Sequence, residues 1–208
     1  MIPAPGRATT LIKICGLRSA NMALAAIEAG ADAIGFVIEV PNSPRSLTVE
    51  KANAIAATLP PRIITIAVLS DADPAVAEQW HGTWLQLHGN ENEGSVARLA
   101  RRRHVIRGFR FDPDAIRRWD DCTDVNTLLI DGSAGGRGEA FRHEELAALM
   151  PRISTPVMLA GGLTPDNVAD AIRTVRPWAV DVSSGVETAP GIKDAGLIRR
   201  FCAAVREK

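Results

Sequence analysis

The length, composition and charge of the chain are those of an ordinary globular protein. Its 208 residues are 46% hydrophobic and 23% charged, which is enough apolar material for a sizeable core in one domain, residues 1–208. The 24 basic and 24 acidic residues balance to a formal net charge of zero, which argues against a nucleic-acid or anionic-membrane partner. With no membrane-length apolar stretch and no signal-like N-terminus, we expect a cytoplasmic protein.

Cysteine and histidine residues are few and scattered. They show neither CxxC spacing nor a local cluster, which argues against a disulfide framework and against a zinc site. We therefore expect no metal and no cofactor. The run Arg101-Arg102-Arg103 is expected to be a solvated helix face rather than a phosphate-backbone site, which would gather more basic residues on one surface.

Apolar runs typical of buried strands alternate with helical periodicity along the whole chain. The strands are expected at residues 11–15, 33–38, 63–69, 85–89, 105–111, 127–131, 156–160 and 178–182. A polar loop at 41–45 precedes the second helix. Later helices are expected to begin at Asp73-Pro74, Asp112-Pro113 and Thr164-Pro165, where proline occupies the first helical turn.

Eight successive strand–helix units predict a closed (β/α)8 barrel, near the lower size limit of that fold. Continuous apolar strands are what a parallel sheet covered by helices requires. An open, doubly wound sheet is the competing architecture. Because no GxGxxG turn follows the first strand, its dinucleotide-binding version is disfavoured.

In a barrel of this kind the active site lies at the carboxyl ends of the strands. The polar residues at or just after those ends are Cys15, Arg45, His88, Arg110, Asp131, Asp181, Ser183 and Ser184. Position alone leaves Cys15 either a buried apolar side chain or a reactive thiol. It leaves Asp131 and Asp181 either functional carboxylates or partners in salt bridges, because a carboxylate closing an apolar strand is costly unless solvated or paired.

Two small-residue loops follow the seventh and eighth strands and predict a phosphate site. One contains Gly161 and Gly162, and the other contains Ser183, Ser184 and Gly185. Small residues let backbone N–H groups approach an anion, and barrels often bind phosphate at these two loops. Tight turns without a ligand are the alternative.

Several short motifs occur in order along the chain. They include Ile12-Lys13-Ile14-Cys15-Gly16, residues 29–36, Ser43-Pro44-Arg45, Gln86-Leu87-His88-Gly89, residues 128–131, residues 159–167 and residues 180–187. Each is weak alone. Together, from about residue 11 to about residue 201, the set resembles the phosphoribosylanthranilate isomerases of tryptophan biosynthesis.

The resemblance implies an Amadori rearrangement of N-(5-phosphoribosyl)anthranilate to 1-(2-carboxyphenylamino)-1-deoxyribulose 5-phosphate, in a monomer or a homodimer. It implies that Asp131 is the general acid and Cys15 the general base, which requires a thiol with a lowered pKa. The remaining implied contacts are Arg45 and Asp181 at the anthranilate end, and Gly161, Gly162, Ser183, Ser184 and Gly185 at the phosphate. From their positions at strand ends, His88 and Arg110 are expected to face the barrel mouth, in either a substrate-contacting or a structural role.

The chain departs from the family pattern in the loop after Asp131. Arg137 stands where a threonine is usual, and Phe141 precedes Arg142-His143 where an Asp-Trp pair is common. The alternatives are a histidine-pathway or dual-substrate sugar isomerase and an inactive phosphosugar-binding barrel. The first resembles this family but carries an aspartate at the position of Cys15, and the presence of both Cys15 and Asp131 argues against the second.

Overall fold

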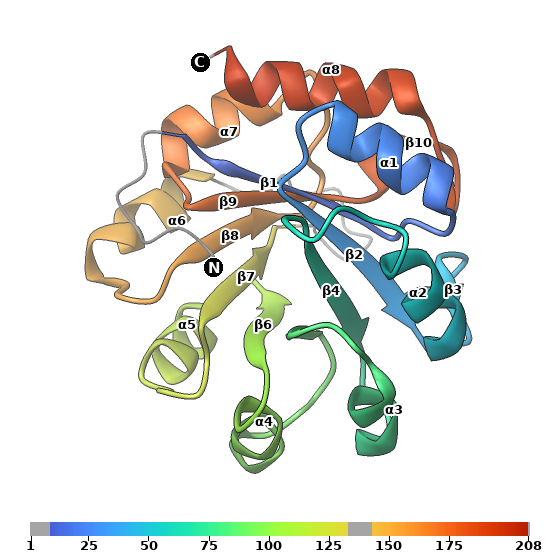
Figure 1. Ribbon diagram of the computed structural model, residues 1–208. Helices are drawn as coiled ribbons and strands as arrows, with labels where there is room; N and C mark the ends of the chain where they lie inside the picture. Colours follow the sequence, from blue (N-terminus) through green and yellow to red (C-terminus); the bar gives the residue numbers. More distant parts are fainter. Residues whose placement is uncertain (1–8, 133–142, 208) are drawn as a thin grey trace.

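The computed structural model describes residues 9–132 and 143–207, and its strands form a closed parallel barrel (Figure 1). In spatial order the barrel strands are β1 (Leu11–Cys15), β2 (Ala33–Ile38), β4 (Ile64–Leu69), β5 (Trp84–Leu87), β6 (His104–Arg110), β7 (Thr127–Asp131), β8 (Val157–Ala160) and β9 (Ala179–Val182). Strand β1 pairs with both β2 and β9, which closes the ring. The predicted (β/α)8 fold is confirmed, whereas one domain over residues 1–208 stays a prediction.

Helices surround the barrel (Figure 1). They are α1 (Ala20–Glu28), α2 (Val49–Ala56), α3 (Pro74–Gln79), α4 (Glu93–Ala100), α5 (Pro113–Asp120), α6 (His143–Leu149), α7 (Val168–Val175) and α8 (Ala195–Arg206). The side chains of Asp73 and Asp112 accept N–H hydrogen bonds at the starts of α3 and α5, each followed by proline. These caps satisfy backbone donors that the first helical turn leaves free. No helix in the described residues is long and apolar enough to cross a membrane.

Two apolar layers follow from the alternation of side chains along each strand. One layer fills the barrel and includes Leu11, Cys15, Leu129 and Ala160. The other lies between strands and helices, with members such as Ile12. Residues two positions apart on a strand therefore lie on the same face. This alternation decides which polar side chains point into the barrel.

The structure adds two short elements that the sequence did not predict. Strand β3 (Ser46–Leu47) pairs with β2 just after the polar loop. A hairpin formed by β10 (Glu187–Ala189) and β11 (Ile192–Lys193) follows β9. Both elements bring charged residues toward the end of the barrel where Cys15 lies.

Helix α7 begins at Val168 rather than at the predicted Thr164-Pro165. The side chain of Asn167 folds back: its Oδ1 accepts the N–H of Thr164 at 2.8 Å, and its Nδ2 donates to the carbonyl of Gly162 at 2.9 Å. These side-chain bonds brace a turn over residues 164–167 that leads into the helix, and the N–H of Val168 donates to the carbonyl of Thr164 at 3.1 Å.

The last helix is tied to the start of the barrel. Arg206 of α8 donates to the carbonyl of Thr10 at 2.7 Å and to Oδ2 of Asp32 at 2.8 Å. The same carboxylate oxygen accepts the N–H of Ile12 at 2.9 Å. The C-terminal element thus secures the first strand beside the loop that leads into the second.

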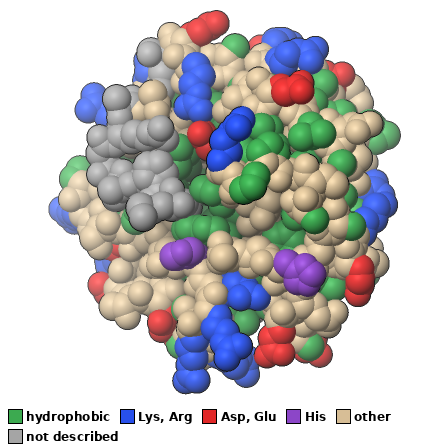
Figure 2. All heavy atoms as spheres, in the orientation of Figure 1, with side chains coloured by type: hydrophobic (Ala, Val, Ile, Leu, Met, Phe, Trp, Pro, Cys, Tyr) green, Lys and Arg blue, Asp and Glu red, His purple; other side chains and the backbone are tan. Residues whose placement is uncertain are grey.

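The arginine run continues past the end of α4 instead of lying along its face. Arg101 and Arg102 are exposed, and Arg103 donates to the carbonyl of Trp80 at 2.9 Å. Figure 2 shows Lys and Arg side chains gathered in the region where Figure 1 places α4. The prediction of a solvated surface is confirmed, but on a turn rather than on a helix.

Candidate active site

The two residues predicted to transfer protons stand at the same end of the barrel and face its interior. Cys15 ends β1 and packs in the inner apolar layer. Asp131 ends β7 two residues after Leu129, a member of that layer, and therefore shares its face. The structure brings the two residues to one mouth, as expected; their chemical roles stay predictions.

Lys13 is the main residue of this site that sequence reasoning missed. It lies opposite Asp181 in the β1–β9 register, and its Nζ donates to Oδ1 of that carboxylate at 2.8 Å. The lysine side chain is 1% exposed and the aspartate side chain 9%. A lysine inside an apolar run, one alternation before Cys15, was the available signal, because buried lysine is rare unless paired.

The surroundings of Cys15 act on its thiol in opposite directions. Burial raises the pKa of Cys15, and the positive charges of Lys13 and Lys193 counteract this without reversing it. The lowered thiol pKa expected from the sequence is therefore not what the structure shows. Most molecules at neutral pH carry the protonated thiol, so the basic form is a minority that nearby cations must stabilise.

His88 and Arg110 lie beside Asp131. The Nε2 of His88 is 4.0 Å from Oδ2 of Asp131, and its Nδ1 is 3.0 Å from Nε2 of Gln86. Burial lowers the pKa of His88, with Asp131 opposing, so the imidazole is largely neutral at pH 7. Arg110 is exposed and paired with Asp131 in the β6–β7 register.

Gly108 makes the position of the His88 ring possible. A Cβ added at Gly108 would lie 2.6 Å from Nδ1 of His88, well inside contact distance. A side chain at this point of β6 would push the ring away from Asp131. Glycine inside a strand often marks such a close approach.

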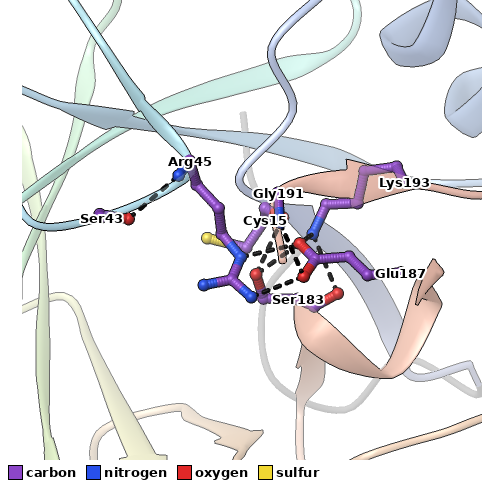
Figure 3. A network of polar contacts seen from close by, with 7 residues as sticks. All are labelled: Cys15, Ser43, Arg45, Ser183, Glu187, Gly191 and Lys193. Atoms are coloured by element: carbon purple, nitrogen blue, oxygen red, sulfur yellow. Dashed lines mark hydrogen bonds and ion pairs between the residues drawn. The ribbon is translucent and has the colours of Figure 1, made fainter. Parts of the chain in front are cut away.

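Arg45 is held by the hairpin that follows β9 (Figure 3). Its Nε and Nη2 donate to the two carboxylate oxygens of Glu187 at 2.7 and 2.6 Å. Lys193 donates to Oε1 of Glu187 at 2.6 Å and to the carbonyl of Ser183 at 2.9 Å. Ser183 Oγ in turn donates to the carbonyl of Cys15 at 3.3 Å. One network therefore joins the Arg45 loop, the end of β1 and a predicted phosphate loop.

Replacing Glu187 by glutamine is expected to destabilise the fold by about 3 kcal/mol at neutral pH. Burial alone would raise the pKa of Glu187, but hydrogen bonds from Arg45 and Lys193 outweigh it and lower this pKa to about 2. A carboxylate whose pKa is lowered by folding stabilises the fold at every pH above the pKa that it has in the unfolded chain. This stabilisation is lost as the pH falls toward 2. Urea denaturation at pH 7 and at lower pH measures the difference.

Glu93→Gln is the matched control for that experiment. The pKa of Glu93 is also lowered to about 2, chiefly by a hydrogen bond from Arg118, but both side chains are about half exposed. Solvent screens such a pair, so this variant should lose much less stability. Equal losses of stability in both variants would show that the buried ion pairs of Glu187 stabilise the fold no more than an exposed pair does.

The two predicted phosphate loops approach each other most closely at Gly185 and Leu163. Gly161 and Gly162 both have positive φ, 89° and 65°, a conformation that favours glycine. A Cβ on Gly185 would stand 1.9 Å from the carbonyl oxygen of Leu163. Gly185 sits in a short 3-10 helix (Ser184–Val186), and Ser184 is exposed. The five predicted residues therefore occupy adjoining turns with accessible backbone.

Gly185→Ala is expected to separate these turns. The added methyl group meets backbone rather than a flexible side chain, so the loops must move, at a cost of about 1–3 kcal/mol. We expect a raised KM for a phosphorylated substrate and a lowered Tm, with kcat affected less. Gly94→Ala in α4 is the control, because the nearest atom to its added Cβ is at 3.4 Å. An unchanged KM in Gly185→Ala would contradict the predicted phosphate site.

In residues 9–132 and 143–207, no three His, Cys, Asp or Glu side chains are grouped so that they could hold a metal ion. Arg137 and Phe141, where the chain departs from the family pattern, lie outside the described residues.

Comparison with known proteins finds relatives over nearly the whole chain. The family model for N-(5′-phosphoribosyl)anthranilate (PRA) isomerase matches residues 12–204. The N-(5′-phosphoribosyl)anthranilate isomerase of Thiobacillus denitrificans is 42% identical over 203 residues, covering 94% of this chain and 97% of the relative.

Two solved structures of phosphoribosylanthranilate isomerases are also similar to this chain. A phosphoribosyl anthranilate isomerase in complex with reduced 1-(o-carboxyphenylamino)-1-deoxyribulose 5-phosphate superposes with a TM-score of 0.84 at 33% identity, covering 96% of this chain and all of the other. A monomeric form of the dimeric Thermotoga maritima enzyme gives 0.83 at 32% identity, with the same coverage. The chain belongs to the N-(5′-phosphoribosyl)anthranilate isomerase family, the isomerases of tryptophan biosynthesis.

Proposed function

We propose that this chain isomerises N-(5′-phosphoribosyl)anthranilate with Asp131 as general acid and Cys15 as general base. The observation that carries the assignment is the placement of both side chains on the inner face of the barrel, at the carboxyl ends of β7 and β1. In this fold that end is where substrates bind.

The reaction needs one proton delivered and one removed before the final tautomerisation. Asp131 gives its proton to the furanose ring oxygen, and the C1′–oxygen bond breaks to leave a Schiff base. The thiolate of Cys15 then takes the proton from C2′, forming an enolamine. A proton added at C1′ and one lost from the C2′ hydroxyl give the ketone, so the atoms of substrate and product are the same.

The proposed binding groups lie around these two residues. Gly161, Gly162 and the Ser183–Gly185 turn receive the phosphate through backbone N–H groups, which supplies binding energy far from the reacting carbons. Arg45 and Asp181 stay assigned to the anthranilate end, where Nη1 of Arg45 is the guanidinium nitrogen not bound to Glu187. His88 and Arg110 flank the acid. A cytoplasmic location and a monomeric or homodimeric state stay predictions.

The direct test follows the loss of substrate fluorescence when purified protein is added to N-(5′-phosphoribosyl)anthranilate. We expect complete consumption without added metal or cofactor. A parallel assay uses the aminoimidazole-carboxamide substrate of the histidine-pathway isomerase, for which we expect no turnover, because Cys15 stands where that enzyme has an aspartate. Absence of fluorescence loss would refute the proposal, and turnover of both substrates would replace it by dual specificity.

A further inference from the structure

Lys13 is a buried cation to which the proposed mechanism assigns no role. Its side chain is 1% exposed, and its Nζ donates a hydrogen bond to Oδ1 of Asp181 at 2.8 Å. Burial alone would lower the pKa of Lys13, but Asp181 and Cys15 outweigh it and raise the pKa. Lys13 is therefore protonated at neutral pH.

The ammonium of Lys13 converges with the thiol of Cys15. The two residues are two positions apart on β1 and share its inner face. Gly35 is paired with Cys15 across β1 and β2. The point where a Cβ of Gly35 would stand is 3.0 Å from Sγ of Cys15 and 3.1 Å from Nζ of Lys13. Because glycine leaves this point empty, both groups have room beside it, and a side-chain hydrogen bond joins Lys13 to Cys15.

Other charged groups also face the thiol. Asp181 approaches from β9 and Lys193 from β11, and the sulfur lies beside the Arg45 side chain in Figure 3. Arg45 and Lys193 both bind Glu187, which offsets their charge at the sulfur. Of all these groups, Lys13 opposes the effect of burial on Cys15 most strongly, through its charge and a side-chain hydrogen bond.

We propose that Lys13 is a positioning residue for the isomerisation: its ammonium binds the thiolate of Cys15 and aims the sulfur at the substrate, while Asp181 fixes the ammonium. This inference rests on the proposed role of Cys15 as the base. When the thiolate takes the C2′ proton it becomes a neutral thiol, and Lys13 keeps its three protons. The lysine stabilises the reactive form without exchanging protons with the substrate.

The test measures the reactivity of Cys15 as a function of pH. Iodoacetamide alkylates thiolates, so its rate at Cys15, followed by peptide mass spectrometry between pH 7 and 11, reports the thiolate fraction. We expect Lys13→Met to slow this alkylation at pH 8 at least about tenfold, because loss of an adjacent opposite charge shifts a pKa by one unit or more. The rising limb of kcat should move to higher pH, with activity partly recovered there.

Lys193→Met is the matched control, since it removes a second buried lysine that faces the same sulfur. It should shift the alkylation profile less than Lys13→Met. Equal shifts would mean that overall positive charge, not Lys13, stabilises the thiolate. An unchanged alkylation profile in folded Lys13→Met protein would overturn the proposal, because a merely structural lysine would lower activity without moving the profile.

A second variant covers the case in which Lys13→Met does not fold. That substitution leaves the Asp181 carboxylate buried without its cation, which is strongly destabilising. Lys13→Met/Asp181→Asn removes both charges, and its profile should still shift to higher pH, because Lys13 acts on the thiol more strongly than Asp181 does. If Cys15→Ser retains activity, the role of Cys15 as base fails, whereas the alkylation data still decide whether Lys13 and Cys15 are paired.

Discussion

Cys15→Ser should lower kcat by about 10²- to 10⁴-fold while leaving KM nearly unchanged. This is the usual contribution of a positioned general base. A serine hydroxyl is a far weaker acid than a thiol, so it supplies almost no proton-free form near neutral pH. Steady-state fluorescence assays at several substrate concentrations separate the two constants. The side chain changes by one atom inside a buried position, so the fold should remain intact.

Cys122→Ser controls for general effects of losing a thiol. Cys122 is half-buried and follows α5, away from the inner layer of the barrel. Its replacement should leave both kcat and KM close to those of the parent protein. Activity within a few-fold of the parent in Cys15→Ser would remove Cys15 from the mechanism.

Asp131→Asn should also lower kcat by about 10²- to 10⁴-fold. The amide keeps the shape of the carboxyl group but has no acidic proton to give to the ring oxygen. Unlike Cys15→Ser, this change also alters a neighbour: Asp131 raises the pKa of His88, so the variant should lower that pKa further. Titration of the His88 ring by NMR measures the shift.

Asp121→Asn is the corresponding control, because Asp121 is exposed in the turn after α5. It should change neither turnover nor the His88 titration. If Asp131→Asn turns over normally, another acid opens the ring. If its His88 pKa does not fall, the two side chains do not interact in solution as they do in the structure.

The barrel could be predicted because each of its elements is encoded locally. Apolar runs ending at glycine or a polar residue marked the strands, and the Asp73-Pro74 and Asp112-Pro113 pairs marked helix starts. The positions of Cys15 and Asp131 at strand ends made them candidates, and their proposed roles came from the resemblance to the family. Local patterns of this kind need no knowledge of distant residues.

The parts that could not be predicted depend on long-range contacts. Arg45 and Glu187 are 142 residues apart in sequence, and Lys13 and Asp181 are 168 apart. Nothing near Glu187 or Lys193 indicates that a hairpin buries them. The start of α7 was misplaced for a different reason: Thr164-Pro165 fits a helix start, but the folded-back Asn167 side chain stabilises a turn instead.

The pairing of β1 with β9 constrains how the chain reaches this structure. Leu11 pairs with Ala179, so during synthesis the ring stays open until the residues of β9 have left the ribosome. The segment between Leu11 and Ala179 must form a closed loop, and contacts of such high sequence separation form slowly. Until then the polar partners at the open edge, Lys13 above all, remain in water, so the site and the closed ring come into being in the same event.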